Sequence, residues 1–463
     1  MIGCTGWNYA PYKPLLFDVG DIYICRLVPA LDSVHCEWLC DDAVANYDVM
    51  LRIEGRGDFQ RAAAVNENEI TVGGLMPDTD YEIYVCSGAR KSRVRLFRTG
   101  ESVGTVVNYL HPRDDAYSFS GRYLCSPSMI KLDDGTLISS MDVFAPNYPQ
   151  NLTLLFRSDD GGATWHYLSE LYPCFWGRLF LHKGDVYMLG CATEYGDLLI
   201  GKSTDGGRTF GAPVTLLRGS GGKNGEAGVH KNPQPPVIFN GRIYGTLEWG
   251  SWGRGYHAAM VMSADADSDL LDPRSWHFTP PIKYDPAWPG VADGPSSGNI
   301  EGTLAIAPDG GLYNVMRYDM TRCTPNYGMV LAYRVNTDDP DAPLEYDHAI
   351  RLPGNHSKFM IRRDGESGKY LTIISRILNS DCAGNRNLLS LMVSDDMENW
   401  RLALDLIDRR DSDPALVGFQ YVDFMIDGED LIYLCRTAVN GAHSFHDSNY
   451  QTFHRVRDFR RMF

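Results

Sequence analysis

Ionisable side chains stand at the ends of short apolar runs along most of this 463-residue chain. Arginine guanidinium groups bind carboxylates and hydroxyls in bidentate fashion, and carboxyl groups, histidines and tyrosines transfer protons. A set of such side chains therefore suits a polar ligand. The same residues could equally line a solvated channel. The set comprises Asp142, Glu194, Glu248, Glu301, Arg317, His356, Arg376, Arg386, Tyr421, Asp423 and Arg436.

A second constellation follows Arg436, in a polar stretch between two apolar runs. His443, His446 and Asp447 lie close together there, a density that suits hydrogen bonding to hydroxyls or proton transfer. Three interpretations stay open: packing of the loop, substrate binding with acid–base work, and a metal site. A metal would need a further close ligand, which the sequence does not supply, so we expect no metal and no other cofactor.

A repeated phrase marks the elements that must position these residues. Residues 158–165 and 203–210 both read S-x-D-x-G-x-T-aromatic, and a degenerate third copy spans 394–400. The aspartate can accept backbone N–H bonds across a tight turn, glycine supplies a positive φ, and the aromatic ring lies beneath the turn. Copies that follow similar apolar runs indicate a repeated β-structure.

The phrase resembles the Asp-box of sialidase-like β-propellers, which lies on the rim of the fold, far from substrate. A longer period agrees with this resemblance, because the sequence contains six units of about 58 residues. Each unit has an apolar strand, a turn and a second strand. We therefore predict an all-β fold with a six-bladed β-propeller over residues 101–463. A strand near residues 105–109 should close the ring by pairing with the last blade.

Residues 1–100 are predicted to form a separate small β-sandwich, because short alternating runs are separated by turn residues. Residues 74–85 resemble the strand corner of a fibronectin type III module, with Tyr81 closing the corner and Trp38 in the core. The resemblance implies a spacer or docking module. The expected strands are 22–27, 34–39, 47–53, 69–72, 81–86 and 93–98.

The sialidase resemblance extends to part of the active site. Glu301 precedes Arg317 by sixteen residues, the family's spacing between the glutamate that supports a tyrosine nucleophile and an arginine that binds the substrate carboxylate. Arg386 precedes Ser394 by eight residues, the family's offset for a second such arginine. Tyr421 lies two residues beyond the position of the nucleophile, on the same strand face. The resemblance implies these four functional roles.

Two positions of the family pattern are missing. Cys125 stands where an arginine of the first blade belongs, and residues 143–151 contain no carboxylate for the acid/base role. Asp142 and Glu248 are therefore the candidate general acids, with a pKa raised by burial. These departures argue against standard sialidase activity. The further substrate-binding candidates are His356, Asp423, Arg436, His443, His446 and Asp447.

Charge and composition exclude several kinds of partner. A net charge of −16 argues against nucleic acid or an anionic membrane surface. No apolar run approaches the roughly 18 residues of a membrane helix. Eleven dispersed cysteines without a CxxC motif, and a start without an apolar leader, favour the cytoplasm. The oligomeric state cannot be read from the sequence.

We therefore expect an exo-acting glycoside hydrolase that binds a carbohydrate and cleaves a terminal, acidic sugar. Two alternatives stay open on the same scaffold. One is a uronate-directed lyase, in which His443 or His446 and Tyr421 would move protons. The other is a carbohydrate-binding propeller without catalysis.

Overall fold

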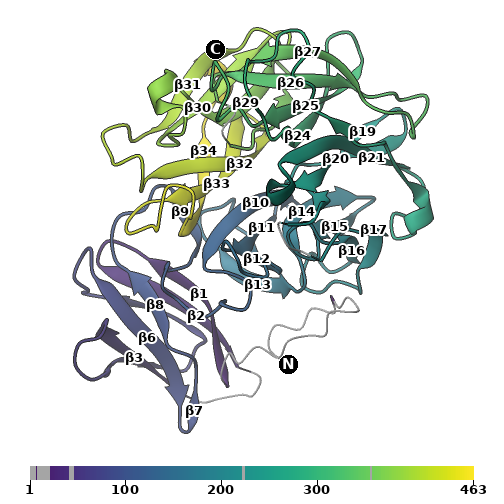
Figure 1. The fold of residues 1–463 in the computed structure, drawn as a ribbon. Coiled ribbons are helices and arrows are strands. Elements are labelled where there is room, and N and C mark those ends of the chain that lie inside the picture. Colours follow the sequence, from purple (N-terminus) through teal and green to yellow (C-terminus); the bar gives the residue numbers. More distant parts are fainter. Residues whose placement is uncertain (1–6, 8–20, 41–45, 222–224, 355–356) are drawn as a thin grey trace.

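The structure is a computed structural model that describes residue 7 and residues 21–40, 46–221, 225–354 and 357–463 (Figure 1). These residues form strands joined by turns, with four short 3-10 helices and no α-helix among them, which confirms the all-β class. None of the described helices is long and apolar enough to cross a membrane. The 3-10 helices are η1 (Trp252–Arg254), η2 (Pro273–Ser275), η3 (Ser380–Cys382) and η4 (Phe459–Met462).

Six antiparallel sheets succeed one another around a common centre in Figure 1, which confirms the six-bladed propeller. The first blade holds β10 (Tyr123–Lys131), β11 (Leu137–Phe144), β12 (Leu152–Ser158) and β13 (His166–Leu171). The second holds β14 (Phe175–His182), β15 (Asp185–Cys191), β16 (Leu198–Ser203) and β17 (Val214–Leu217). The third holds β18 (Gly228–His230), β19 (Val237–Phe239), β20 (Arg242–Ser251), β21 (Tyr256–Asp265), β22 (Trp276–Phe278) and β23 (Ile282–Lys283).

The remaining three blades have four strands each. The fourth holds β24 (Asn299–Ile306), β25 (Leu312–Tyr318), β26 (Met329–Arg334) and β27 (Glu345–Arg351). The fifth holds β28 (Ile361–Arg363), β29 (Tyr370–Ser375), β30 (Leu388–Ser394) and β31 (Arg401–Asp408). The sixth holds β32 (Gly418–Asp427), β33 (Asp430–Ala438) and β34 (Tyr450–Val456), completed by β9 (Thr105–Tyr109).

The ring closes through β9, which pairs with β34 although more than 300 residues separate them in sequence. Tyr109 lies opposite Tyr450 and Thr105 opposite Phe453. This confirms the predicted closing strand. Pairing the first strand of the propeller with the last leaves no open edge between the ends of the ring, so each blade is packed on both sides.

The repeated turns make the hydrogen bonds that their sequence predicts. Asp160 accepts hydrogen bonds from the backbone N and the hydroxyl of Thr164 at 2.9 and 2.6 Å. Trp165 is buried and packs on Phe453 of the sixth blade, with 5.6 Å between ring centres. Gly162, at φ 96°, lies so close to Phe453 that a Cβ there would stand 2.2 Å from the ring. The first turn thus fastens the first blade to the last.

Two sheets precede the propeller. One has the order β1 (Ile22–Pro29), β2 (Ser33–Cys40), β5 (Glu69–Gly73), and Trp38 of β2 packs edge-on against Tyr47 of the second sheet. The Tyr81 hydroxyl accepts a hydrogen bond from Met76 N at 2.9 Å, the contact of a tyrosine corner. The fibronectin type III assignment and the boundary at residue 100 remain predictions. The second sheet holds β3 (Tyr47–Ile53), β4 (Gln60–Val65), β6 (Asp80–Ser87), β7 (Arg90–Lys91) and β8 (Arg95–Arg98).

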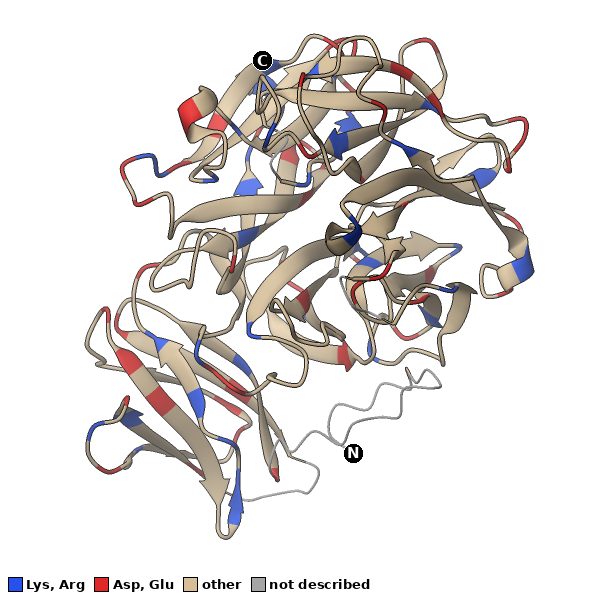
Figure 2. Ribbon diagram, viewed as in Figure 1, with Lys and Arg blue, Asp and Glu red and all other residues tan. Residues whose placement is uncertain are grey.

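Buried polar contacts join these two sheets to the propeller. Arg26 donates hydrogen bonds to the carbonyl oxygens of Val106 and Val107 on β9, at 3.1 and 2.8 Å. Arg95 forms a buried ion pair with Asp114 at 2.7 Å. Acidic and basic residues are interspersed over both parts of the chain (Figure 2). These buried hydrogen bonds and this ion pair therefore hold the N-terminal sheets against the propeller.

Candidate active site

Four innermost strands share one backbone irregularity. β10, β14, β24 and β32 each shift register against the second strand of their blade. At each shift a non-glycine residue adopts a left-handed conformation: Ser126 (φ 56°), Trp176 (φ 51°), Glu301 (φ 59°) and Tyr421 (φ 55°). Such a bulge re-aims one side chain, and strained backbone of this kind is concentrated at functional sites. Two of the four are predicted catalytic residues.

Glu301 and Tyr421 meet through their side chains. The Tyr421 hydroxyl donates a hydrogen bond to one carboxylate oxygen of Glu301 at 2.5 Å, and Arg317 donates to the other oxygen at 2.5 Å. Arg317 also lies 3.5 Å from the Tyr421 hydroxyl. These residues come from the fourth and sixth blades, which are not neighbours, so the contact lies near the propeller axis. The structure thus brings together three residues that the sequence predicted as partners.

The charge states of this pair follow from its surroundings. Burial alone would raise the pKa of the Glu301 carboxyl, but Arg317 and the Tyr421 hydrogen bond hold that pKa below its ordinary value. Burial and the Glu301 charge raise the pKa of Tyr421 despite the nearby arginines. An ionised Glu301 carboxylate therefore accepts a hydrogen bond from the neutral Tyr421 phenol. In this state the carboxylate can take the phenolic proton.

Three arginines surround this tyrosine. The guanidinium carbons of Arg386 and Arg436 lie 5.9 and 4.9 Å from the Tyr421 ring centre, and Arg317 contacts its hydroxyl. The largest charge effects on Tyr421 come from Glu301 and these three arginines. We call these five residues the axial cluster. One carboxylate against three guanidinium groups leaves an excess of positive charge, which favours an anionic ligand.

The third arginine has no counterpart in the predicted family pattern. Cys125 leaves the first-blade position empty, whereas Arg436 reaches the axial cluster from β33 of the sixth blade. Its guanidinium donates to the backbone carbonyl of His446 and lies 4.9 Å from the ring centre of Phe144. The sequence named Arg436 as a substrate-binding candidate but assigned it no position in the family pattern.

The histidine loop is tied together by one carboxylate. Asp447 bonds His443 Nδ1 at 2.8 Å and His446 Nδ1 at 2.9 Å. The His443 ring stacks on Tyr123. Burial, reinforced by the charge of Arg436, lowers the pKa of His446 to about 4. The loop therefore holds the His446 carbonyl oxygen beside the axial cluster, where it accepts the hydrogen bond from Arg436.

The other predicted carboxylates lie in the interior. Asp142, Glu248 and Asp423 are at most 1% exposed. Asp142 accepts hydrogen bonds from Thr153 at 2.5 Å and Gly177 N at 3.3 Å, and burial raises its pKa to about 7. Asp423 pairs with Arg178 at 2.5 Å and accepts from Met129 N. His356 lies outside the described residues.

Glu248 orients a histidine that the sequence did not single out for catalysis. Its carboxylate bonds His230 Nδ1 at 2.6 Å and accepts from Gly302 N at 3.2 Å, the residue after Glu301. Glu194 is only half-buried and accepts a hydrogen bond from Gln150 Nε2 at 2.9 Å, and burial raises its pKa.

Comparison with known proteins identifies the fold. No family model and no curated protein matches the sequence. An α-L-arabinanase of Penicillium chrysogenum, solved with arabinobiose, has a TM-score of 0.50 and 14% identity over 77% of this chain and 98% of its own. The GH93 α-L-arabinofuranosidase of Fusarium graminearum has a TM-score of 0.51 at the same identity and coverage. The K499G mutant of NanB sialidase from Streptococcus pneumoniae has a TM-score of 0.50 and 9% identity over 94% of this chain and 93% of its own.

The buried Asp142 carboxyl makes stability depend on pH. In the unfolded chain this group titrates near pH 3.9, whereas the folded protein holds its pKa at about 7. Between these values the unfolded state has lost a proton that the folded state keeps, so the free energy of unfolding falls as pH rises. We predict that Asp142→Asn removes up to about 3 kcal/mol of this fall between pH 5 and pH 8. Urea unfolding at both pH values measures it.

Asp133→Asn is the matched control, because Asp133 is exposed at the end of the same hairpin. It should leave the pH dependence of the wild type unchanged. Equal pH slopes for the wild type and Asp142→Asn would show that Asp142 is ionised in the folded protein.

Proposed function

We propose that this chain is an exo-acting glycoside hydrolase that removes a terminal acidic sugar, with Tyr421 as the nucleophile. The observation that carries the proposal is the hydrogen-bonded Tyr421–Glu301 pair within a ring of three arginines. The fold shared with an arabinanase, an arabinofuranosidase and a sialidase supports a carbohydrate substrate. The missing family positions make standard sialidase activity the less favoured form of this chemistry.

The first step forms a bond between the Tyr421 oxygen and the anomeric carbon. Glu301 takes the phenolic proton as this bond forms, so no full phenolate develops beside an anionic sugar. The bond to the leaving oxygen breaks, and that oxygen receives a proton from a general acid. Water then attacks the anomeric carbon and the bond to the Tyr421 oxygen breaks; Tyr421 recovers its proton from Glu301, and the general acid recovers its own proton from water. Two displacements at the same carbon retain the configuration of the sugar.

We assign the general acid to Glu194. A retaining mechanism needs one carboxylate held ionised and one held protonated, and environments that push pKa values apart identify the two roles. The pKa is lowered at Glu301 and raised at Glu194. Asp142 also has a raised pKa, but it is fully buried, as is Glu248, whereas Glu194 is partly exposed. Glu248 then acts as a positioning residue for His230.

The arginines select the sugar. A planar guanidinium binds a carboxylate through two parallel hydrogen bonds, and three of them around one position favour a substrate with a carboxylate on the reacting sugar. Arg386 donates a hydrogen bond to Gln420 and Arg436 donates one to the carbonyl of His446, and both arginines are at most 8% exposed. A carboxylate on the sugar would add charge–charge attraction to these buried guanidinium groups, which a neutral sugar lacks.

Glu301→Gln tests the nucleophile pair. Because glutamine cannot accept the phenolic proton, kcat should fall by about 10²–10⁴. The assay follows release of 4-methylumbelliferone from a panel of acidic and neutral glycosides. Glu345→Gln, the same change at an exposed site on β27 of the same blade, should retain wild-type activity. Wild-type turnover by Glu301→Gln, or products that carry an unsaturated sugar absorbing in the near ultraviolet, would contradict the hydrolase mechanism.

Glu194→Gln tests the general acid separately. Natural glycosides need a proton on the leaving oxygen, so their hydrolysis should slow by about 10²–10⁴. Dinitrophenyl glycosides of the same sugar leave without a proton, so kcat/KM for them, which reports the first step, should stay near wild type, whereas kcat falls because the second step loses its base. Asp142→Asn is the comparison, and it should affect kcat/KM for both substrates equally. An equal loss of kcat/KM on both substrates for Glu194→Gln would remove Glu194 from this role.

A further inference from the structure

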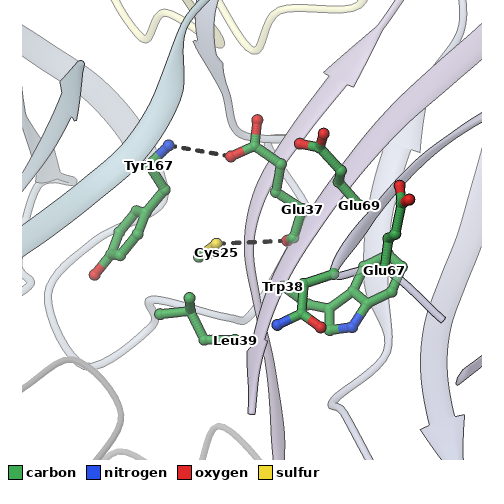
Figure 3. Close-up of a pocket in the computed structure, with 8 residues that line it drawn as sticks. Cys25, Glu37, Trp38, Leu39, Glu67, Glu69 and Tyr167 are labelled. Atoms are coloured by element: carbon green, nitrogen blue, oxygen red, sulfur yellow. Dashed lines mark hydrogen bonds between the residues drawn. The ribbon is translucent and has the colours of Figure 1, made fainter. Parts of the chain in front are cut away.

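Four potential metal ligands converge where the N-terminal sheets meet the propeller, a region distinct from the axial cluster. His35 and Glu37 lie on β2, Glu69 on β5, and His166 begins β13 of the first blade. The ligand atoms of His35, Glu37 and Glu69 lie within 4.8 Å of one another. Figure 3 shows the Glu37 and Glu69 side chains on neighbouring strands at the side of a cavity.

Strand geometry explains why these residues meet. His35 and Glu37 alternate by two along β2 and therefore project from the same face. Glu37 lies directly opposite Glu69 in the β2–β5 pair. Tyr167 N donates a hydrogen bond to Glu37 at 3.1 Å, which places β13 and its neighbour His166 against the same carboxylate.

The four carboxylate–imidazole distances approach those around a tetrahedral ion. Glu37 Oε1 lies 3.3 Å from His35 Nε2 and 3.3 Å from His166 Nδ1. Glu69 Oε2 lies 3.8 and 3.7 Å from the same two nitrogens. Ligands bound tetrahedrally to zinc at ordinary bond lengths are about 3.4 Å apart. Both carboxylates are thus near this spacing from both imidazoles, whereas His166 lies outside the compact group of His35, Glu37 and Glu69, so binding of an ion would draw the His166 ring inward.

Outer contacts hold the ligands in position. Thr71 Oγ1 lies 3.0 Å from His35 Nδ1, so the opposite nitrogen faces the carboxylates. Arg26 donates to Glu37 Oε1, the oxygen that faces both histidines, at 2.6 Å, and Tyr167 N donates to Oε2 at 3.1 Å. Hydrogen bonds from a second shell are usual for metal-binding histidines and carboxylates. Two carboxylates against Arg26 leave one uncompensated negative charge, which a cation would neutralise.

The site is accessible from one side. The Glu37 side chain is 9% exposed, whereas those of Glu69 and His166 are 47% and 55% exposed. A cavity of about 370 Å³ lined by Glu37, Glu69 and Tyr167 adjoins it. An ion can therefore enter from solvent without separating the N-terminal sheets from the first blade.

We propose that His35, Glu37, Glu69 and His166 bind a divalent transition-metal ion of the zinc class through two nitrogens and two oxygens. Imidazole and carboxylate ligands in a tetrahedral set favour Zn²⁺ over Mg²⁺ or Ca²⁺. The ion connects β2 and β5 to β13 and so fastens the N-terminal sheets to the first blade. This proposal is independent of the hydrolase mechanism.

Calorimetric titration of the chelator-treated full chain with Zn²⁺ tests the site. We expect one equivalent to bind and the thermal unfolding midpoint to rise. His35→Ala and His166→Ala should each weaken binding by more than tenfold, and Thr71→Val, which keeps all four ligands, by about tenfold. Co²⁺ in place of Zn²⁺ should give the visible absorption of a tetrahedral complex.

His277→Ala is the matched control, because His277 is also part-exposed and pairs with a single carboxylate, Asp341 at 3.0 Å. It should bind Zn²⁺ as the wild type does. Circular dichroism of each variant without metal establishes that it is folded. The proposal fails if the wild type binds no Zn²⁺, or if folded His35→Ala and His166→Ala bind it with wild-type affinity.

Discussion

Closure of six sheets into one ring is the constraint on which the rest of this structure depends. The β9–β34 pairing fixes the circumference, and the innermost strands then converge on one axis. Polar side chains there face one another across blades that are not neighbours. Glu301 and Tyr421 can share a 2.5 Å hydrogen bond only because bulges on β24 and β32 turn both residues toward this axis. The candidate chemistry is therefore a consequence of the ring.

The axis is positively charged in a chain whose net charge is −16. Beyond the three arginines of the axial cluster, Lys231 donates to the carbonyl of Trp176, and Lys358 to that of Val422. Burial lowers the pKa of these two lysines to about 8 and about 7. Asp423 is paired with Arg178, so this buried ion pair adds no net charge. A local field of this sign attracts an anionic ligand even when the whole protein repels one.

Sequence predicted the parts of the structure that depend on local patterns. The repeated turns predicted the propeller and its closing strand, and the Glu301–Arg317 spacing predicted a contact that the structure contains. Burial of Asp142 and Glu248 was expected, but the sequence did not show that it leaves them no exposed surface, because second strands of propeller blades are buried on both faces and ionisable residues there look like site residues. Arg436 was among the substrate-binding candidates, but its approach to Tyr421 depends on how the loop after β33 packs, which the sequence does not specify. The β-bulges likewise follow from ring geometry, since no residue type specifies them.

The central claim is that Tyr421 attacks the anomeric carbon. An activated fluorosugar that carries a carboxylate would react in the first step and hydrolyse slowly in the second, so the covalent intermediate accumulates. Mass spectrometry of the digested protein then locates the sugar. The mechanism predicts one sugar per chain, attached to Tyr421 and absent from Tyr421→Phe. Attachment to another residue, or inactivation of Tyr421→Phe at the wild-type rate, would contradict it.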